Sequence, residues 1–76
     1  MNTRQLEYFI AIAELQSFRR AAARLYVSQS AISQQLKSLE HELGCRLLNR
    51  DNHSVSLTSA GRTFLEDSRD VLTRLD

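Results

Sequence analysis

The sequence predicts a mainly α-helical domain with one short β-hairpin, arranged as a winged helix-turn-helix. Three observations lead to this fold. Apolar residues recur at helical spacing in four segments of the 76-residue chain. A connection of only three residues joins the second and third segments, as a tight turn between two helices requires. After the third segment the pattern changes to alternation around a polar turn, which indicates a hairpin.

The first helix is predicted to begin after a cap at Asn2 or Thr3 and to carry two apolar stripes. One stripe consists of Leu6, Phe9, Ile10 and Ala13. The other, on a different side of the helix, consists of Tyr8, Ile12 and Leu15. One side can serve the core of the domain, so the other requires a further helix or a second subunit.

The second helix is predicted to be capped by Ser17 and to contain the small residues Ala21 and Ala22, which let a neighbouring helix approach closely. The connection 26–28 follows, and Ser28 is the expected cap of a third helix over residues 29–43. Gly44 suits the left-handed conformation that ends such a helix.

The third helix has an apolar side and a polar side. Its core-facing stripe consists of Ile32, Leu36, Leu39 and Leu43. The opposite side consists of Ser30, Gln34, Lys37 and His41, with Ser33 beside them and Gln29 in the first turn. Gln can offer a donor and an acceptor together to adenine, Ser can serve either role, and Lys suits guanine or phosphate. This side is therefore a candidate surface for DNA bases.

Strands of three or four residues are expected on either side of the turn 51–53, with Val55 and Leu57 alternating with serines. Arg50, beside that turn, could reach the DNA backbone or minor groove. Thr58 or Ser59 is expected to cap a last helix, in which Gly61 indicates close packing. Its wide apolar stripe and the lack of a helix stop before Asp76 predict a truncated fragment that keeps a dimer contact.

Charge and composition narrow the possible partners. Residues 17–50 carry six positive and two negative side chains, whereas residues 51–76 carry three positive and five negative ones. The basic middle of the chain permits a polyanionic partner. The single cysteine fits a reducing compartment, and no apolar run is long enough for a signal peptide or a membrane span. A cytoplasmic location is therefore expected.

Taken together, linked features along nearly the whole chain resemble the N-terminal DNA-binding domain of LysR-type transcriptional regulators. These features are Phe9, Ser17-Phe18, Ala21-Ala22, Leu25, Val27-Ser28-Gln29, Ser33, Leu39-Glu40, Leu43-Gly44, Leu47, Arg50 and Leu57-Thr58 with Gly61. The resemblance implies a DNA-binding domain over residues 1–57 and a linker helix over residues 58–76, through which two chains pair. It also implies a bacterial regulator that binds inverted repeats as a dimer or tetramer, with a small-molecule effector domain that is absent here.

Two departures concern the third helix. Ser30 stands where the family commonly has proline, and Gln34 stands where relatives often carry arginine, so this helix is less charged than usual. We expect Lys37 and the wing to take a larger share of the contacts with DNA. The residues expected at the DNA are Ser17, Ser28, Gln29, Ser30, Ser33, Gln34, Lys37, Arg50 and His53. Those expected at the dimer interface are Tyr8, Ile12, Leu15, Phe64, Leu65, Val71, Leu72 and Leu75.

Other interpretations stay open. The polar residues of the third helix could simply be solvated, His53 could be a plain turn residue, and Arg50 could pair with Asp51 or the acidic last helix. A winged-helix module that binds another protein is the alternative function. An enzyme is not expected, because no nucleophile–base pair, phosphate loop or carboxylate dyad is visible. Neither is a cofactor or a metal site, since Gly44 ends the helix between His41 and Cys45 and no second pair of ligands exists.

Overall fold

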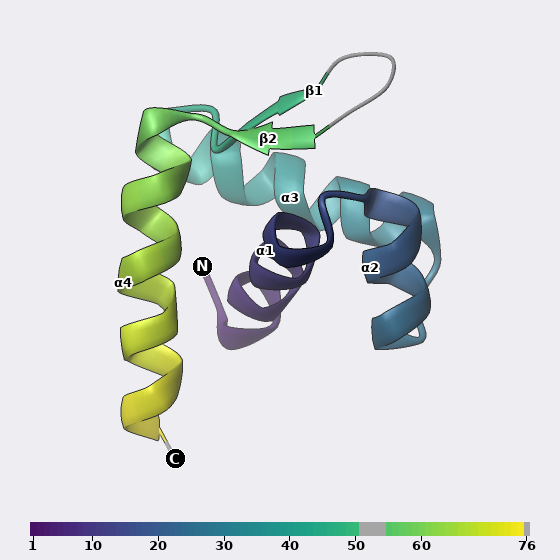
Figure 1. Ribbon diagram of the computed structural model, residues 1–76, viewed down its shortest axis with the longest axis horizontal. Coiled ribbons are helices and arrows are strands. Elements are labelled where there is room, and N and C mark those ends of the chain that lie inside the picture. The colour runs from purple at the N-terminus through teal and green to yellow at the C-terminus, as the bar shows by residue number, and fades with distance from the viewer. Residues whose placement is uncertain (51–54, 76) are drawn as a thin grey trace.

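A computed structural model describes residues 1–50 and 55–75 and confirms the winged helix-turn-helix. Its elements are α1 (Thr3–Leu15), α2 (Phe18–Leu25), α3 (Gln29–Leu43), β1 (Leu48–Arg50), β2 (Val55–Leu57) and α4 (Ser59–Leu75). The two strands are antiparallel, and Leu48 pairs with Leu57. Helix α1 lies between α2 and α4, while the hairpin lies over α3 at one end of the molecule (Figure 1).

Local signals set the helix boundaries. The side-chain oxygens of Asn2, Ser17 and Ser28 each accept a hydrogen bond from the backbone N–H three residues later, at 2.9–3.1 Å. Each cap satisfies one of the N–H groups that the first turn of a helix leaves without a partner. Gly44 ends α3 with φ +74°, and Gln16 and Tyr26 end the two shorter helices in the same left-handed region. The predicted limits of α2 and α3 are therefore confirmed.

The core is built around α1. Phe9 and Ile12 are fully buried, and Ile32 and Leu39 of α3 pack into the same cluster. Helices α2, α3 and α4 of the same chain all contact α1. They cover both of its apolar stripes, so the further helix that the second stripe required is supplied within the chain.

This packing corrects the dimer residues expected on α1. Ile12 is 0% exposed and Tyr8 is 9% exposed, so neither offers a surface to a second subunit. Leu15 is half-buried and packs against the core. Leu65 of α4 is also 9% exposed, because its side of the helix faces the core rather than a partner.

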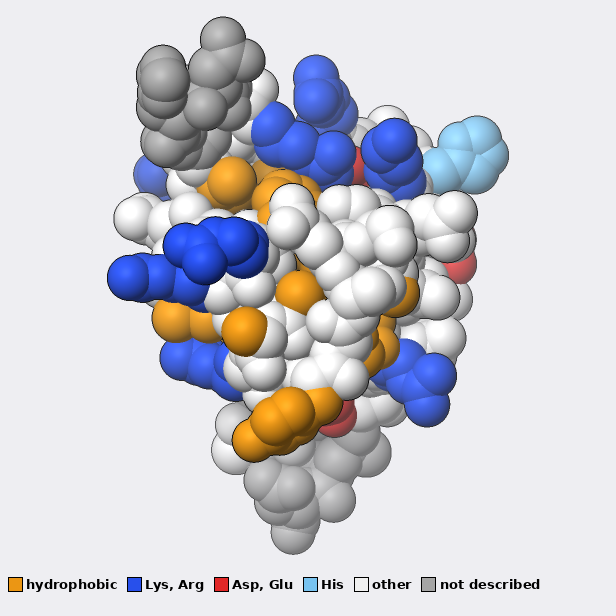
Figure 2. All heavy atoms as spheres, turned by 90° about the vertical axis from the view of Figure 1, so that its right-hand side faces the viewer, with side chains coloured by type: hydrophobic (Ala, Val, Ile, Leu, Met, Phe, Trp, Pro, Cys, Tyr) orange, Lys and Arg blue, Asp and Glu red, His pale blue; other side chains and the backbone are white. Residues whose placement is uncertain are grey.

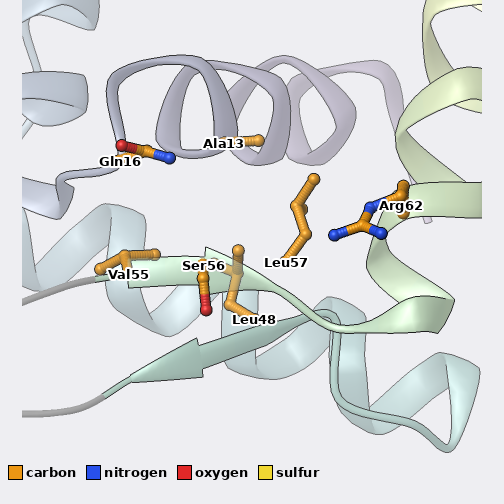
Figure 3. A pocket seen from close by; sticks show the side chains of 7 residues that line it. All are labelled: Ala13, Gln16, Leu48, Val55, Ser56, Leu57 and Arg62. Carbon is orange, nitrogen blue, oxygen red and sulfur yellow. The ribbon is translucent and has the colours of Figure 1, made fainter.

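The hairpin is fastened at its base to the start of α4. The Thr58 hydroxyl donates to the carbonyl oxygen of Arg46 at 2.7 Å and accepts from the Gly61 N–H at 2.9 Å, so Thr58 is the cap of α4. On the side of the hairpin that faces α1, Leu57 points toward Ala13, and both residues line a small hollow together with Arg62 of α4 (Figure 3). The wing thus packs against α1 and α4 as well as α3.

Candidate nucleic-acid interface

Helix α3 separates its apolar residues from its polar ones almost completely. Ile32, Leu36 and Leu39 are at most 1% exposed and hold the helix against the core. Four polar residues on the other side are exposed and a fifth is half-exposed: Gln29, Ser30, Gln34 and Lys37, and Ser33. The structure therefore brings together on one accessible surface the five α3 residues that the sequence predicted there.

The start of α3 has features that favour an anion. Ser28 uses its hydroxyl to accept from the Ala31 N–H at 3.1 Å, and the hydroxyl of Ser30 lies 3.3 Å from it. Helical geometry leaves the N–H groups of the first turn without carbonyl partners inside the helix. Together with the positive end of the helix dipole, these groups favour a phosphate. Ser17 is a cap in the same way, and its hydroxyl accepts from the Arg20 N–H at 3.0 Å.

Exposed cations accompany the polar surface of α3, and one of them, Lys37, is part of it. The side chains of Arg19, Arg20, Lys37 and Arg46 are exposed. Figure 2 shows the side on which α2 and the start of α3 lie, with mostly white backbone and uncharged side-chain atoms in its middle, some orange between them, and blue side chains toward the hairpin end and the edges. Arg24, by contrast, is engaged with Glu14 of α1 at 3.2 Å. A polar centre with basic edges suits a polyanion that also presents hydrogen-bonding groups.

The side chain of Arg50 contacts other residues of the protein. Its guanidinium pairs with the Glu40 carboxylate of α3 at 3.3 Å and lies over the ring of Phe18, 4.8 Å from the ring centroid. The side chain is only 27% exposed. The sequence suggests Asp51 or the last helix as the partner of Arg50, but not Glu40, because no local pattern links residues ten positions apart across a loop.

An apolar surface remains on α4. Val71 is 46% exposed, while Phe64 and Leu72 are half-buried. Phe64 packs edge-on against Phe9 of α1, with 5.5 Å between the ring centroids. Beside it lies a shallow groove lined by Met1, Leu6, Phe64, Asp67, Ser68 and Val71. Of the predicted dimer residues on α4, the structure thus leaves Val71 and parts of Phe64 and Leu72 accessible.

Two predicted site residues, His53 and the side chain of Leu75, lie outside the described part of the chain. In the helices that are described, none has both the length and the apolar character needed to cross a bilayer.

Comparison with known proteins agrees with this arrangement. The sequence model of a family described as bacterial regulatory helix-turn-helix protein, lysR family, matches residues 3–62. Over 73 residues the chain is 55% identical to the uncharacterized HTH-type transcriptional regulator YnfL of Escherichia coli K12, a match that covers 96% of this chain and 25% of YnfL. The chain thus spans about a quarter of the length of the curated relatives it matches.

Solved structures give the same result. The DNA-binding domain of CbnR in complex with DNA superposes with a TM-score of 0.96 at 48% identity, covering 99% of this chain and 86% of that one. The DNA-binding domain of BenM with the benA site 1 DNA also gives a TM-score of 0.96, at 39% identity, and covers 100% and 88% of the two chains. With the family model matching most of its length and the fold reproduced throughout, this chain belongs to the lysR family of bacterial regulatory helix-turn-helix proteins.

Proposed function

We propose that this chain binds double-stranded DNA in a sequence-specific manner, with α3 in the major groove. The observation that carries the proposal is the exposed polar surface of α3 opposite a fully buried apolar stripe. An α-helix fits the major groove, where each base pair presents a distinct pattern of donors and acceptors. The CbnR and BenM domains, solved with DNA, support this role.

Within this arrangement the residues have different tasks. Gln29 and Ser33, near the start of α3, are placed to contact base edges, as the N-terminal residues of a recognition helix do. Ser30 and Gln34 extend the same surface, and Lys37 can reach either guanine or a phosphate. The capped starts of α2 and α3, at Ser17 and Ser28, are placed for the phosphate backbone. The wing turn, with His53, is proposed to reach the backbone or the minor groove.

A dimer is the proposed form on DNA. The exposed Val71 and the accessible edges of Phe64 and Leu72 support a contact through α4, which is proposed to act as the linker helix. Because such a dimer is symmetric, its site would be an inverted repeat whose half-site spacing mirrors the spacing of the two α3 helices. By analogy with its longer relatives, we also propose that the chain works in the bacterial cytoplasm as part of a regulator that forms tetramers and binds an effector through another domain.

The test is selection of duplexes from a random library, followed by fluorescence anisotropy at several salt concentrations. The wild-type chain should enrich an inverted repeat and bind it with an affinity that falls linearly with salt on a log–log scale. Q29A and S33A should each reduce the preference for the selected site over mixed-sequence DNA by about 1–3 kcal/mol. If the chain shows no salt-sensitive binding to any duplex, the alternative of a winged helix that binds another protein is favoured.

A further inference from the structure

Glu40, which is not part of the exposed polar surface of α3, forms hydrogen bonds with the start of the wing. One of its carboxylate oxygens accepts from the N–H groups of Leu47 and Leu48, at 2.7 and 3.2 Å. The other accepts from the Arg50 guanidinium at 3.3 Å. The carboxylate is only 13% exposed, and hydrogen bonds to an ionised acceptor are among the stronger ones in proteins. The last turns of α3 therefore determine where β1 begins.

Arg50 completes this arrangement from the other side. Its planar guanidinium contacts both the Glu40 carboxylate and the ring of Phe18, the first residue of α2. Its Nε is buried and has no hydrogen-bond partner among the described residues. An arginine that binds a phosphate directs its N–H groups outward, whereas one Nη of Arg50 donates to Glu40 and its Nε is buried. The charge of Arg50 is thus directed toward the protein.

We infer that Arg50 and Glu40 are positioning residues for DNA recognition, which set the wing relative to α3 rather than contacting DNA. The inference rests on the proposed function. Phe18, Glu40 and Arg50 belong to α2, α3 and β1, so one cluster joins both helices of the helix-turn-helix to the wing. A major-groove helix and a wing on the neighbouring backbone must lie at a fixed separation to bind one site together. Specific binding needs this separation, whereas loose binding to mixed-sequence DNA does not.

Charge-conserving and charge-removing variants separate positioning from direct contact. R50K keeps the positive charge, which serves a phosphate, but loses the flat fork that stacks on Phe18 and meets Glu40. E40Q removes a negative charge near the DNA, so by electrostatics alone it should tighten binding. E42Q is the matched control, because Glu42 is on the same helix but 49% exposed and paired only with the N-terminal amine among the described residues.

The experiment measures affinity of the full chain for a duplex selected by the wild type and for a mixed-sequence duplex. We expect R50K and E40Q to reduce the ratio of these affinities about tenfold, the size of one lost base contact, and E42Q to leave it unchanged. F18L, which keeps apolar volume but removes the ring beneath Arg50, should act in the same direction. It provides a second route if R50K fails to fold by circular dichroism. Hydrogen exchange should show the amides of Leu47 and Leu48 less protected in E40Q.

Three results would overturn the inference. If R50K binds DNA like the wild type and E40Q binds at least as tightly as E42Q, then Arg50 is a direct contact to DNA or a plain surface charge. Faster amide exchange in E40Q with an unchanged affinity ratio would make the cluster structural only. A wild-type chain without salt-sensitive binding to any duplex would remove the proposed function, and the inference with it. This last outcome is recognised before any variant is compared.

Discussion

Gly61, in the first turn of α4, lies so close to the backbone of Leu47 that a β-carbon at residue 61 would collide with the Leu47 carbonyl oxygen. The same oxygen accepts a hydrogen bond from the Thr58 N–H at 3.0 Å. Because the colliding atom belongs to the backbone, no side-chain rotation relieves the contact. The joint between the wing and α4 therefore needs glycine here for space.

Replacing Gly61 by alanine should change the free energy of unfolding in the direction opposite to that expected from helix propensity. Alanine is more favourable than glycine in an α-helix by about 1 kcal/mol, so propensity alone predicts that G61A stabilises the chain. We expect it to destabilise by about 1–3 kcal/mol, because the backbone at Leu47 must shift. Urea unfolding measures the difference, and T63A, at an exposed position in the same helix, should stay within about 0.5 kcal/mol of the wild type. An increase in stability for G61A would contradict the contact.

Substitutions of Ser28, the cap of α3, can distinguish an effect on folding from an effect on DNA binding. Aspartate caps a helix about as well as serine, so S28D should keep the stability of the chain within about 0.5 kcal/mol. A negative charge at the proposed phosphate site should nevertheless weaken DNA binding by about tenfold or more. S28N, a neutral cap, is the control and should lose much less. If S28D binds DNA like S28N, then no phosphate sits at the start of α3.

Gln34 is an exposed, uncharged residue of α3 at which a positive charge can be added. Q34R should strengthen binding to all duplexes and increase the salt slope by about 0.9, the effect of one further phosphate contact. T73R adds the same charge near the far end of α4, well away from the start of α3 in Figure 1, and should leave the slope unchanged. Equal slopes for Q34R and the wild type would place residue 34 away from the DNA backbone.

Dimerisation can be tested at Val71, because its 46% exposure lets a charge be introduced without disturbing the core. V71D should shift the chain toward monomer in sedimentation at micromolar concentration and lower its affinity for an inverted repeat more than for a single half-site. T73D places the same charge on a neighbouring exposed residue and is the control. A wild-type chain that stays monomeric both free and on DNA would refute the α4 contact.

Local chemistry made much of this fold predictable. Ser17 and Ser28 cap helices in the sequence pattern and in the structure, and Gly44 ends α3 as its lack of a β-carbon allows. The alternation of apolar and polar residues predicts the strands of the wing, and the helical spacing of apolar residues predicts the polar side of α3. These features depend on neighbours within a few residues, so they can be predicted from the sequence alone.

Contacts between segments that are distant in the sequence could not be predicted in this way. The sequence shows both apolar stripes of α1 but not that the chain's own helices cover them, so it predicts Tyr8 and Ile12 at a second subunit, whereas both are buried within the chain. Arg50 was placed at the DNA because its sequence neighbours suggest an exposed wing.

The chain by itself thus determined which helices form, where they end, and which side of α3 stays polar, because caps, glycines and periodicity act locally. Only the tertiary structure decided what covers α1 and where the charge of Arg50 points. Burial and ion pairing depend on which surfaces meet when separate elements pack. Glu40 and Phe18 reach Arg50 only when α2, α3 and β1 converge.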